Sequence, residues 1–426
     1  MDHLRSTKVV VPLKHVILMA LVTSLSNGGS TRLLAAAAAS EDDGVQQIWH
    51  KWHASGFSWV SPTPPTTAKP TSIPTRAPTL RPTSPCTSAF TVATYDAIDD
   101  DIASIKENIL DDESRSRFLG GILRLAAHDF MDFDPRRSIP MGPDGCFDEN
   151  HATNAGLERV WCDDCGLTLL YRQKYAHVSR ADFWIAAANA VIRLTSVDNA
   201  LDLKETFRWG RRDRSSCGGT GARLPGSAGC ADIEEVLVAR MGLRWKDAAA
   251  LMGAHTLGGG NRGSSGHHGS WVGNNQDAQV FDRQYYLEIT DKVWRPRNQG
   301  GPENGGPPQD WTTGRNNGNG QMMLNTDICL AFDIDQFRRR GVPCCSRTDK
   351  TFSNGENECI DREAARSRCP RYSPRDPRRA ATDAVYKYVS DNDNTLFYED
   401  FAEAWQKATT VGQRRLHPLA ETCELV

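Results

Sequence analysis

The 426-residue chain carries 50 lysines and arginines against 53 aspartates and glutamates, a formal net charge of -3. This balance argues against nucleic acid or an anionic membrane surface as a partner. The length is sufficient for one large domain or for two to three ordinary ones, so the pattern along the chain must decide between them.

Residues 1–40 are typical of a secretory signal region. Lys8 and Lys14 precede an apolar run over residues 16–22, and small residues follow up to Ala39. A basic start, a short apolar core and small residues in this order predict a signal peptide and a secreted protein. The run is too short to span a bilayer comfortably, so we expect no stable membrane insertion after the signal is removed. An uncleaved anchor is the alternative.

Residues 41–85 form a linker in this interpretation. Pro, Thr and Ser dominate from Ser61 to Pro85, with scattered Lys and Arg. Such a segment cannot bury enough apolar surface to offset its ordering entropy, so we expect it to be exposed and disordered. The folded domain then spans residues 86–426.

All twelve cysteines lie at or after Cys86. An even number behind a secretory signal predicts disulfides, although their connectivity cannot be deduced. Cys217 and Cys230 flank a Gly-rich loop and could be bridged to each other. Cys162 and Cys165 are expected to form a structural bridge rather than a redox pair or half a zinc site. Four cysteines share one polar insertion and could pair there: Cys344, Cys345, Cys359 and Cys369.

The folded part is predicted to be mainly α-helical. Apolar residues at helical spacing indicate helices over residues 95–109, 118–131, 181–194, 233–240, 246–252, 383–389 and 398–407. Convincing alternating strands are absent from the pattern. Two long loops rich in Gly, Asn and Pro, over 258–275 and 297–320, are expected to be functional or anchored by ions and disulfides.

The first candidate for chemistry is the pair Arg124 and His128. They stand four residues apart on an apolar helix and therefore share one face. An Arg beside a His in apolar surroundings predicts acid–base work on a small polar substrate, with the Arg stabilising negative charge. The alternative is an Arg that reaches solvent beside a core His. Asn154 could accept from one ring nitrogen of His128 and so fix its tautomer.

Oxygen atoms near this pair could bind a hard cation. Asp129, Gly142, Asp144 and Cys146 lie in one stretch of the sequence, and carboxylate and carbonyl oxygens suit such an ion. The alternative interpretation of residues 142–146 is an ordinary Pro-Asp-Gly turn.

The second candidate is His255, at the end of an apolar helix and before a Gly-rich loop. This position suits an axial haem ligand, although a hydrogen-bonded core His is the commoner occurrence. A carboxylate usually orients such a ligand. Asp327 supplies one from the apolar stretch 322–327, where an unpaired Asp would be costly.

Five motifs in order resemble the plant, fungal and bacterial haem peroxidase superfamily, from about Thr94 to Lys407. They are the Arg124 and His128 pair, Arg180–Val191, Gly210-Arg-Arg-Asp213, Arg223-Leu-Pro225 and Gly253-Ala-His-Thr-Leu-Gly258. The resemblance implies about ten helices in two lobes that sandwich haem b. It also implies a peroxidase that reduces hydrogen peroxide and oxidises an unidentified organic or protein donor through a ferryl intermediate. In that comparison Arg124, His128 and Asn154 would be catalytic.

The C-terminal half resembles the cytochrome c and ascorbate peroxidase branch. The segment Ser265–Trp271 is similar to the one that places a Trp against the axial His, and Asp327 stands in a motif like that branch's Met-Met-Leu-x-Thr-Asp. Phe281-Asp-x-x-Tyr-Tyr286 matches as well. By this similarity a proximal Ca²⁺ or K⁺ would be surrounded by Thr256, Asn275, Asp277, the carbonyl of Val280 and Asp282.

The sequence departs from the superfamily at three positions. Ala127 precedes the distal His where Phe or Trp is normal, which implies a roomier pocket. Cys146 stands where calcium-binding relatives have Ser, so it could be disulfide-bonded instead. Ser264 occupies the place of the ascorbate-contacting Arg, so we do not expect ascorbate specificity.

Two other functions must be distinguished from a peroxidase. A haem-binding extracellular module with little or no turnover would retain His255, and Ala127 is its best support. A zinc hydrolase would use His255, His267 and His268. Adjacent histidines in a Gly/Ser loop are more often solvated than metal-bound, and no general base is placed for that chemistry.

Overall fold

The computed structural model describes residues 90–419 except 298–309, 314–320, 335–368 and 370. The expected signal (1–40), the linker (41–85) and five of the cysteines lie outside the described residues: Cys86, Cys344, Cys345, Cys359 and Cys423. Among the described residues, no helix has the length and apolar character needed to cross a membrane.

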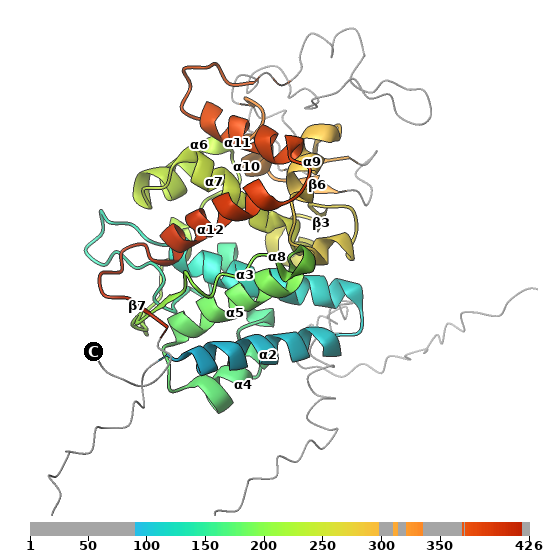
Figure 1. Ribbon diagram of the computed structural model, residues 1–426. Helices are drawn as coiled ribbons and strands as arrows, with labels where there is room; N and C mark the ends of the chain where they lie inside the picture. The colour runs from blue at the N-terminus through green and yellow to red at the C-terminus, as the bar shows by residue number, and fades with distance from the viewer. Residues whose placement is uncertain (1–89, 298–309, 314–320, 335–368, 370, 420–426) are drawn as a thin grey trace, which may run out of the picture. The chain divides into compact units, whose positions relative to one another are not determined.

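The described part is mainly α-helical, as the sequence predicts (Figure 1). Its α-helices are α2 (Val92–Asn108), α3 (Asp112–Met131), α4 (Gly166–Leu170), α5 (Arg180–Thr195), α6 (Cys230–Ile233), α7 (Trp245–Met252), α8 (Arg262–Ser265), α9 (Gln284–Asp291), α10 (Asn325–Ile328), α11 (Arg379–Ser390) and α12 (Thr395–Thr409). Side-chain caps begin three of the long helices, α2, α3 and α5. Asp111 accepts from Ser114 N at 2.7 Å before α3, and Ser179 accepts from Asp182 N at 3.1 Å before α5.

The predicted helix over 233–240 has a different form. Only Cys230–Ile233 is α-helical, and Glu234–Arg240 continues as a π-helix. Hydrophobic periodicity could not reveal the π-helix, because its wider turns over a few residues still direct the apolar side chains toward the same neighbours. The short helices α4, α8, α9 and α10 were not predicted. Three of them, α4, α8 and α10, have only four or five residues, too few to show a period.

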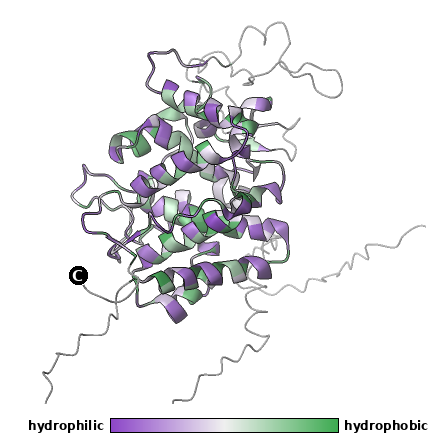
Figure 2. Cartoon of the chain, viewed as in Figure 1, coloured by the Kyte–Doolittle hydropathy of each residue, from purple (hydrophilic) through white to green (hydrophobic). Residues whose placement is uncertain are grey.

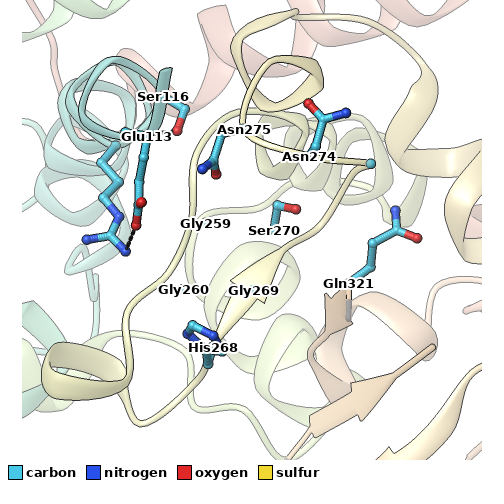
Figure 3. Close-up of a pocket in the computed structure, with 12 residues that line it drawn as sticks. Glu113, Ser116, Gly259, Gly260, His268, Gly269, Ser270, Asn274, Asn275 and Gln321 are labelled. Carbon is cyan, nitrogen blue, oxygen red and sulfur yellow. Dashed lines mark hydrogen bonds and ion pairs between the residues drawn. The ribbon is translucent and has the colours of Figure 1, made fainter. Parts of the chain in front are cut away.

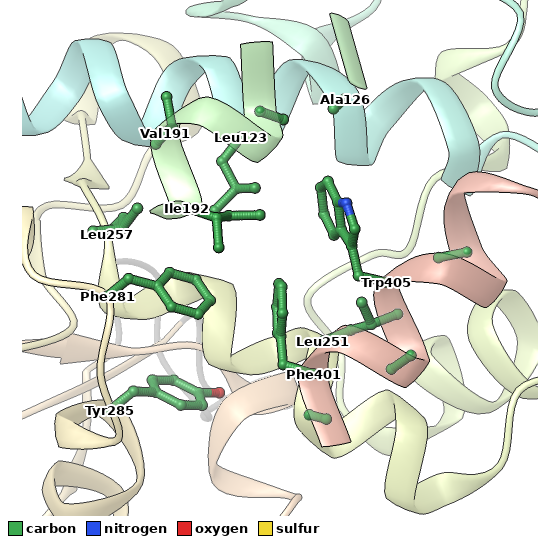
Figure 4. Close-up of a cluster of buried hydrophobic side chains, with 14 of the residues drawn as sticks. Leu123, Ala126, Val191, Ile192, Leu251, Leu257, Phe281, Tyr285, Phe401 and Trp405 are labelled. Carbon is green, nitrogen blue, oxygen red and sulfur yellow. The ribbon is translucent and has the colours of Figure 1, made fainter. Parts of the chain in front are cut away.

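Two groups of helices pack against each other. Helices α2 and α3 both contact α5, whereas α12 and α11 contact α7 and α9 contacts α11. Helix α12 also contacts α3 and so joins the groups. In Figure 2 polar and apolar residues alternate around the helices, and Figure 4 shows apolar side chains of both groups meeting in one core. The labelled examples include Leu123 and Ala126 from α3, Ile192 from α5, Leu251 from α7 and Trp405 from α12, all buried.

Short strands connect the helices. A hairpin pairs β2 (Gly259–Gly260) with β3 (Gly269–Ser270), in the register Gly259↔Ser270. An antiparallel sheet has the order β4 (Arg295–Arg297), β5 (Asp310–Thr312) and β6 (Met322–Met323). A third pair joins β1 (Arg208–Trp209) to β7 (His417–Pro418). These strands are too short for an alternating pattern to appear in the sequence.

The disulfides differ in part from expectation. Cys162–Cys165 is bridged as predicted. The expected Cys217–Cys230 pairing is wrong, because Cys217 bonds to Cys146 and Cys230 bonds to Cys329. Each bridge therefore connects segments far apart in sequence instead of closing the loop between Cys217 and Cys230. Cys369 is also disulfide-bonded.

Candidate active site

Helix α3 places Arg124 and His128 one turn apart on the same face. Arg124 Nε donates to His128 Nε2 at 3.2 Å, and its terminal nitrogens donate to the carbonyls of Thr153 at 2.7 Å and Ala155 at 3.0 Å. The guanidinium is therefore held in the interior and does not reach toward solvent. A fixed positive charge lies beside the imidazole.

His128 is oriented by Asn154. The ring Nδ1 lies 2.7 Å from Asn154 Oδ1, and the amide nitrogen of Asn154 donates to Asp148 O at 2.9 Å. Because the Asn154 nitrogen is engaged elsewhere, its oxygen faces the ring, so Nδ1 is the donor and Nε2 the acceptor. Burial and the charge of Arg124 lower the pKa of His128 to about 3. The imidazole is thus a neutral base whose accepting nitrogen faces Arg124.

His255 lies in a 3₁₀ turn, Gly253–Thr256, that follows α7 directly. Glycine is required at the start of this turn, because a Cβ on Gly253 would lie 2.4 Å from Tyr286 Oη and 2.5 Å from the ring of Phe397. His255 Nδ1 lies 2.8 Å from Asp327 Oδ1, a carboxylate that is fully buried. The turn and the carboxylate together fix the direction of the ring.

The carboxylate of Asp327 accepts hydrogen bonds from four donors. Besides His255, its Oδ1 accepts from Tyr285 Oη at 2.6 Å, and its Oδ2 accepts from Trp271 Nε1 at 2.8 Å and Leu324 N at 2.6 Å. Burial alone would raise the pKa of Asp327, but the charge of His255 and these hydrogen bonds hold the pKa below its usual value. The group is a carboxylate, and His255 Nδ1 is the donor. The sequence did not point to Tyr285 as a partner of Asp327, because a buried Tyr looks like any core aromatic residue.

Trp271 covers one face of His255. Their ring centroids lie 4.3 Å apart with planes 20° from parallel. Since Trp271 also donates to Asp327, its orientation depends on the same carboxylate that orients His255. The expected association of Trp271 with His255 is therefore present in the structure.

The two histidine-bearing elements face each other. A Cβ on Gly120 of α3 would lie 2.9 Å from the Cα of Gly258. Gly258 stands three residues after His255 and has a φ of +77°. Backbone thus contacts backbone at this point. His255 is also near enough for its charge to contribute to the low pKa of His128.

These residues fit a haem group. With Nδ1 bound to Asp327, Nε2 of His255 has no partner among the described residues, and the side chain is 30% exposed although its surroundings are buried. An imidazole with one oriented ring nitrogen that has no partner among the described residues is the kind of ligand that haem iron takes in an axial position. Arg124 and His128 supply an acid–base pair on the facing helix.

The predicted distal ion ligands are only partly brought together. Asp129 is fully buried and accepts from the backbone nitrogens of Asp144, Gly145 and Cys146 at 3.3, 3.0 and 2.9 Å. Asp144 pairs with Arg214 at 2.8 Å. Cys146 is bonded to Cys217, the alternative to an ion site that its departure from the usual Ser indicated.

The carboxylates of this region are close enough to affect one another. Burial and the neighbouring Asp129 raise the pKa of Asp132 to about 9, while Gly142 N donates to it at 2.8 Å. Burial raises the pKa of Asp144 to about 7 and that of Asp129 well above its usual value. We refer to Asp129, Asp132 and Asp144 as the acidic cluster.

The predicted proximal ion ligands are also divided. Thr256 Oγ1 lies 3.2 Å from the carbonyl of Val280 and 3.3 Å from Asp282 Oδ1. Asp277 instead accepts from Asn274, at 3.2 Å from its backbone nitrogen and 3.0 Å from its amide. Asn275 lines the pocket described below. Within the described chain, no cluster of three or more His, Cys, Asp or Glu side chains has metal-binding geometry.

The three histidines of the alternative zinc site do not converge. His267 Nδ1 lies 2.9 Å from Asp310 Oδ2, whereas His255 is bound to Asp327. His268 lines a polar pocket of about 340 Å³ between the start of α3 and the β2–β3 hairpin (Figure 3). The two charged side chains of that pocket, Glu113 and Arg117, pair with each other at 2.5 Å.

Ser264 lies at the edge of the site. A Cβ on Gly156 would lie 3.1 Å from Ser264 Oγ and 3.4 Å from a terminal nitrogen of Arg124. The small hydroxyl of Ser264 thus lies near Arg124. Ser264 stands where the ascorbate enzymes have the arginine that contacts ascorbate. Ala127 is partly buried against the hydrophobic core.

Comparisons with known proteins agree with this geometry. A family model described as peroxidase matches residues 103–339. The chain is 32% identical over 174 residues to a probable peroxisomal L-ascorbate peroxidase 3 from Oryza sativa subsp. japonica, covering 39% of this chain and 54% of the relative. It is 29% identical over 250 residues to a mitochondrial cytochrome c peroxidase from Candida albicans, covering 56% of this chain and 62% of the relative. The chain thus spans about half to three fifths of the length of these curated relatives.

Proposed function

Because the chain belongs to the peroxidase family, we propose that it is a haem peroxidase that reduces hydrogen peroxide and oxidises an organic or protein electron donor. One observation carries the proposal. A neutral, oriented His128 beside Arg124 lies on the helix that faces His255 and its buried carboxylate Asp327.

His255 Nε2 would hold the iron of haem b. Its Nδ1–H donates to Asp327, which increases the basicity of the ring. When bound, the haem supplies the iron that binds peroxide and takes up the oxidising equivalents. Trp271, stacked on His255, is the nearest aromatic group that could pass an electron from a donor toward this site.

His128 would move the proton that peroxide reduction requires. Its Nε2 takes the proton from one peroxide oxygen and delivers it to the other, so that the departing oxygen leaves as water. Asn154 keeps Nδ1 protonated, which leaves Nε2 as the base. The Arg124 guanidinium, 3.2 Å from that nitrogen, stabilises negative charge on the departing oxygen. The balanced reaction converts one peroxide and a two-electron, two-proton donor into two waters and the oxidised donor.

We also propose that the protein is secreted. The support is the signal-like segment 1–40 and the disulfides that join Cys146 to Cys217 and Cys230 to Cys329. By contrast, the relatives' names place them in peroxisome and mitochondrion.

A Ca²⁺ or K⁺ ion is part of the proposal. The support at the distal site is limited to the raised pKa values of Asp129 and Asp144, two buried carboxylates, because the acidic cluster as described does not have the geometry of a metal site. The proximal candidate rests on the oxygens of Thr256, Val280 and Asp282, which lie together. Isothermal calorimetry with each ion tests both sites.

The function is tested by loading the full chain with haem b. We expect a Soret band and peroxide-dependent oxidation of guaiacol. A Soret band without turnover would favour the non-catalytic haem-binding module, for which Ala127 is the best support. Absence of the band at stoichiometric haem would contradict both functions.

A further inference from the structure

A second His–Asp pair lies outside the residues used so far. His267 Nδ1 lies 2.9 Å from Asp310 Oδ2, and the two side chains are only 13% and 2% exposed. Separating such a buried pair would leave a desolvated carboxylate without its partner, so the pair fixes the position of one backbone segment relative to the other. The proposed proton and electron chemistry has no use for either side chain directly.

The pair joins the two segments that position Trp271. His267 stands just before β3 (Gly269–Ser270), and Trp271 follows that strand directly. Asp310 begins β5, whose residues Trp311 and Thr312 pair with Met323 and Met322 of β6. Strand β6 leads through Leu324 into α10, which carries Asp327.

A second contact joins the β2–β3 hairpin to β6. A Cβ on Gly260 of β2 would lie 2.8 Å from Met322 Cε and 3.1 Å from the backbone carbon of His267. The hairpin therefore packs directly on β6. The residue that follows β3 and the helix that follows β6 are joined in turn, because Trp271 Nε1 donates to Asp327 Oδ2 at 2.8 Å.

We propose that His267 and Asp310 are positioning residues that hold Trp271 in its stacked, hydrogen-bonded place against His255 and Asp327. This inference rests on the proposed function only for its consequence in electron transfer. The positioning of Trp271 by His267 and Asp310 does not depend on whether the protein binds haem. The adjacent His268 provides a contrast, because it lines the polar pocket between the start of α3 and the hairpin (Figure 3).

Three variants test the proposal. His267→Phe keeps a ring of similar size and removes the bond to Asp310. His267→Asn retains an amide N–H near the position of Nδ1 and should restore the bond in part. His268→Phe is the matched control, the same change one residue along. Circular dichroism establishes that each variant is folded.

The first measurement uses the haem-free full chain. We expect the indole Nε1–H of Trp271, assigned by NMR, to exchange with solvent roughly 3- to 10-fold faster in His267→Phe, since one hydrogen bond restrains its segment less. His267→Asn should lie between this variant and wild type, and His268→Phe should match wild type. Equal exchange in all four proteins, or equal acceleration in His267→Phe and His268→Phe, would refute the positioning role.

The second measurement uses haem-loaded protein and one equivalent of peroxide. In His267→Phe the yield of tryptophan radical, measured by electron paramagnetic resonance, should fall at least about threefold. The rate of the first reaction with peroxide should stay unchanged, because Arg124 and His128 are untouched. If wild-type protein does not react with peroxide, the proposed function fails, while the indole exchange still decides the positioning role.

Discussion

Trp271 and His255 stack with ring centroids 4.3 Å apart, and both donate a hydrogen bond to Asp327. One carboxylate therefore sets the direction of two rings at once. Tyr285 is a third side-chain donor to it, so the charge of Asp327 is compensated on every side. The proximal half of the site is organised around this single buried charge.

Replacing that charge should weaken the proximal side selectively. In Asp327→Asn the His255 ring loses its ionic partner, so we expect a 10- to 100-fold loss of haem affinity or of the rate with peroxide. Haem titration and stopped-flow absorbance measure the two quantities. Asp310→Asn, which also changes a buried Asp–His pair, is the control and should leave haem affinity within about threefold of wild type.

His128→Leu tests the distal base. The variant should bind haem as wild type does, because His255 and Asp327 are unaffected. We expect the spectral change caused by peroxide to slow by roughly 10²- to 10⁴-fold, the usual contribution of a positioned acid–base group. Stopped-flow kinetics unchanged from wild type would remove His128 from the mechanism.

The pH dependence follows from the low pKa of His128. Because burial and Arg124 lower this pKa to about 3, the neutral base persists down to acid pH. The rate with peroxide should therefore be nearly constant between about pH 5 and 8 and should fall as the pH approaches 3. A midpoint near 6.5, the value of a free histidine, would contradict this environment. His128→Leu, measured over the same range, should show no such fall.

The sequence predicted the features that depend on local pattern. Arg124 and His128 share a face because they stand one turn apart. The apolar period located both ends of α5 and the end of α3 to within one residue, but it missed the first six residues of α3. Asp327 was identified because an Asp in an apolar stretch needs a partner. These inferences need only neighbours in sequence or the cost of an unpaired charge.

Long-range choices were beyond the same reasoning. Cys217 and Cys230 looked like partners because they are near in sequence, but the fold brings Cys146 and Cys329 to them instead. The Tyr285 contact with Asp327 and the His267 contact with Asp310 likewise span 42 and 43 residues. Pairings of this kind depend on how helices and strands pack, which periodicity does not encode.

The acidic cluster should make stability depend on pH. The pKa of Asp132 is raised from 3.8 to about 9, so the folded state is favoured most at acid pH and loses stability as the pH rises between these values. Asp132→Asn keeps the oxygen that accepts from Gly142 N and cannot ionise. We expect it to stabilise the protein by about 1 to 3 kcal/mol at pH 8 and by much less at pH 4.

Urea unfolding at the two pH values, without added divalent cations, measures this difference. Asp134→Asn is the comparison, since Arg136 and its hydrogen bonds lower the pKa of Asp134 to about 2. That change should not stabilise the protein at pH 8. A stabilisation of equal size at both pH values would show that Asp132 is not the titrating group.

Two of the disulfides should contribute unequally. Cys146–Cys217 joins residues 71 apart, whereas Cys162–Cys165 joins residues 3 apart. Because the entropy removed from the unfolded chain grows with loop length, replacing the first pair by serines should cost about 4 kcal/mol and the second pair less than half of that. Equilibrium denaturation of the two double variants makes the comparison, and the reverse order would contradict the long-range bridge.

The contact between Gly120 and Gly258 has a consequence for the width of the site. Backbone touches backbone there, so neither glycine could carry a side chain unless α3, which bears His128, moved away from the segment that follows His255. The spacing of these two elements thus depends on two residues that carry no reactive group of their own.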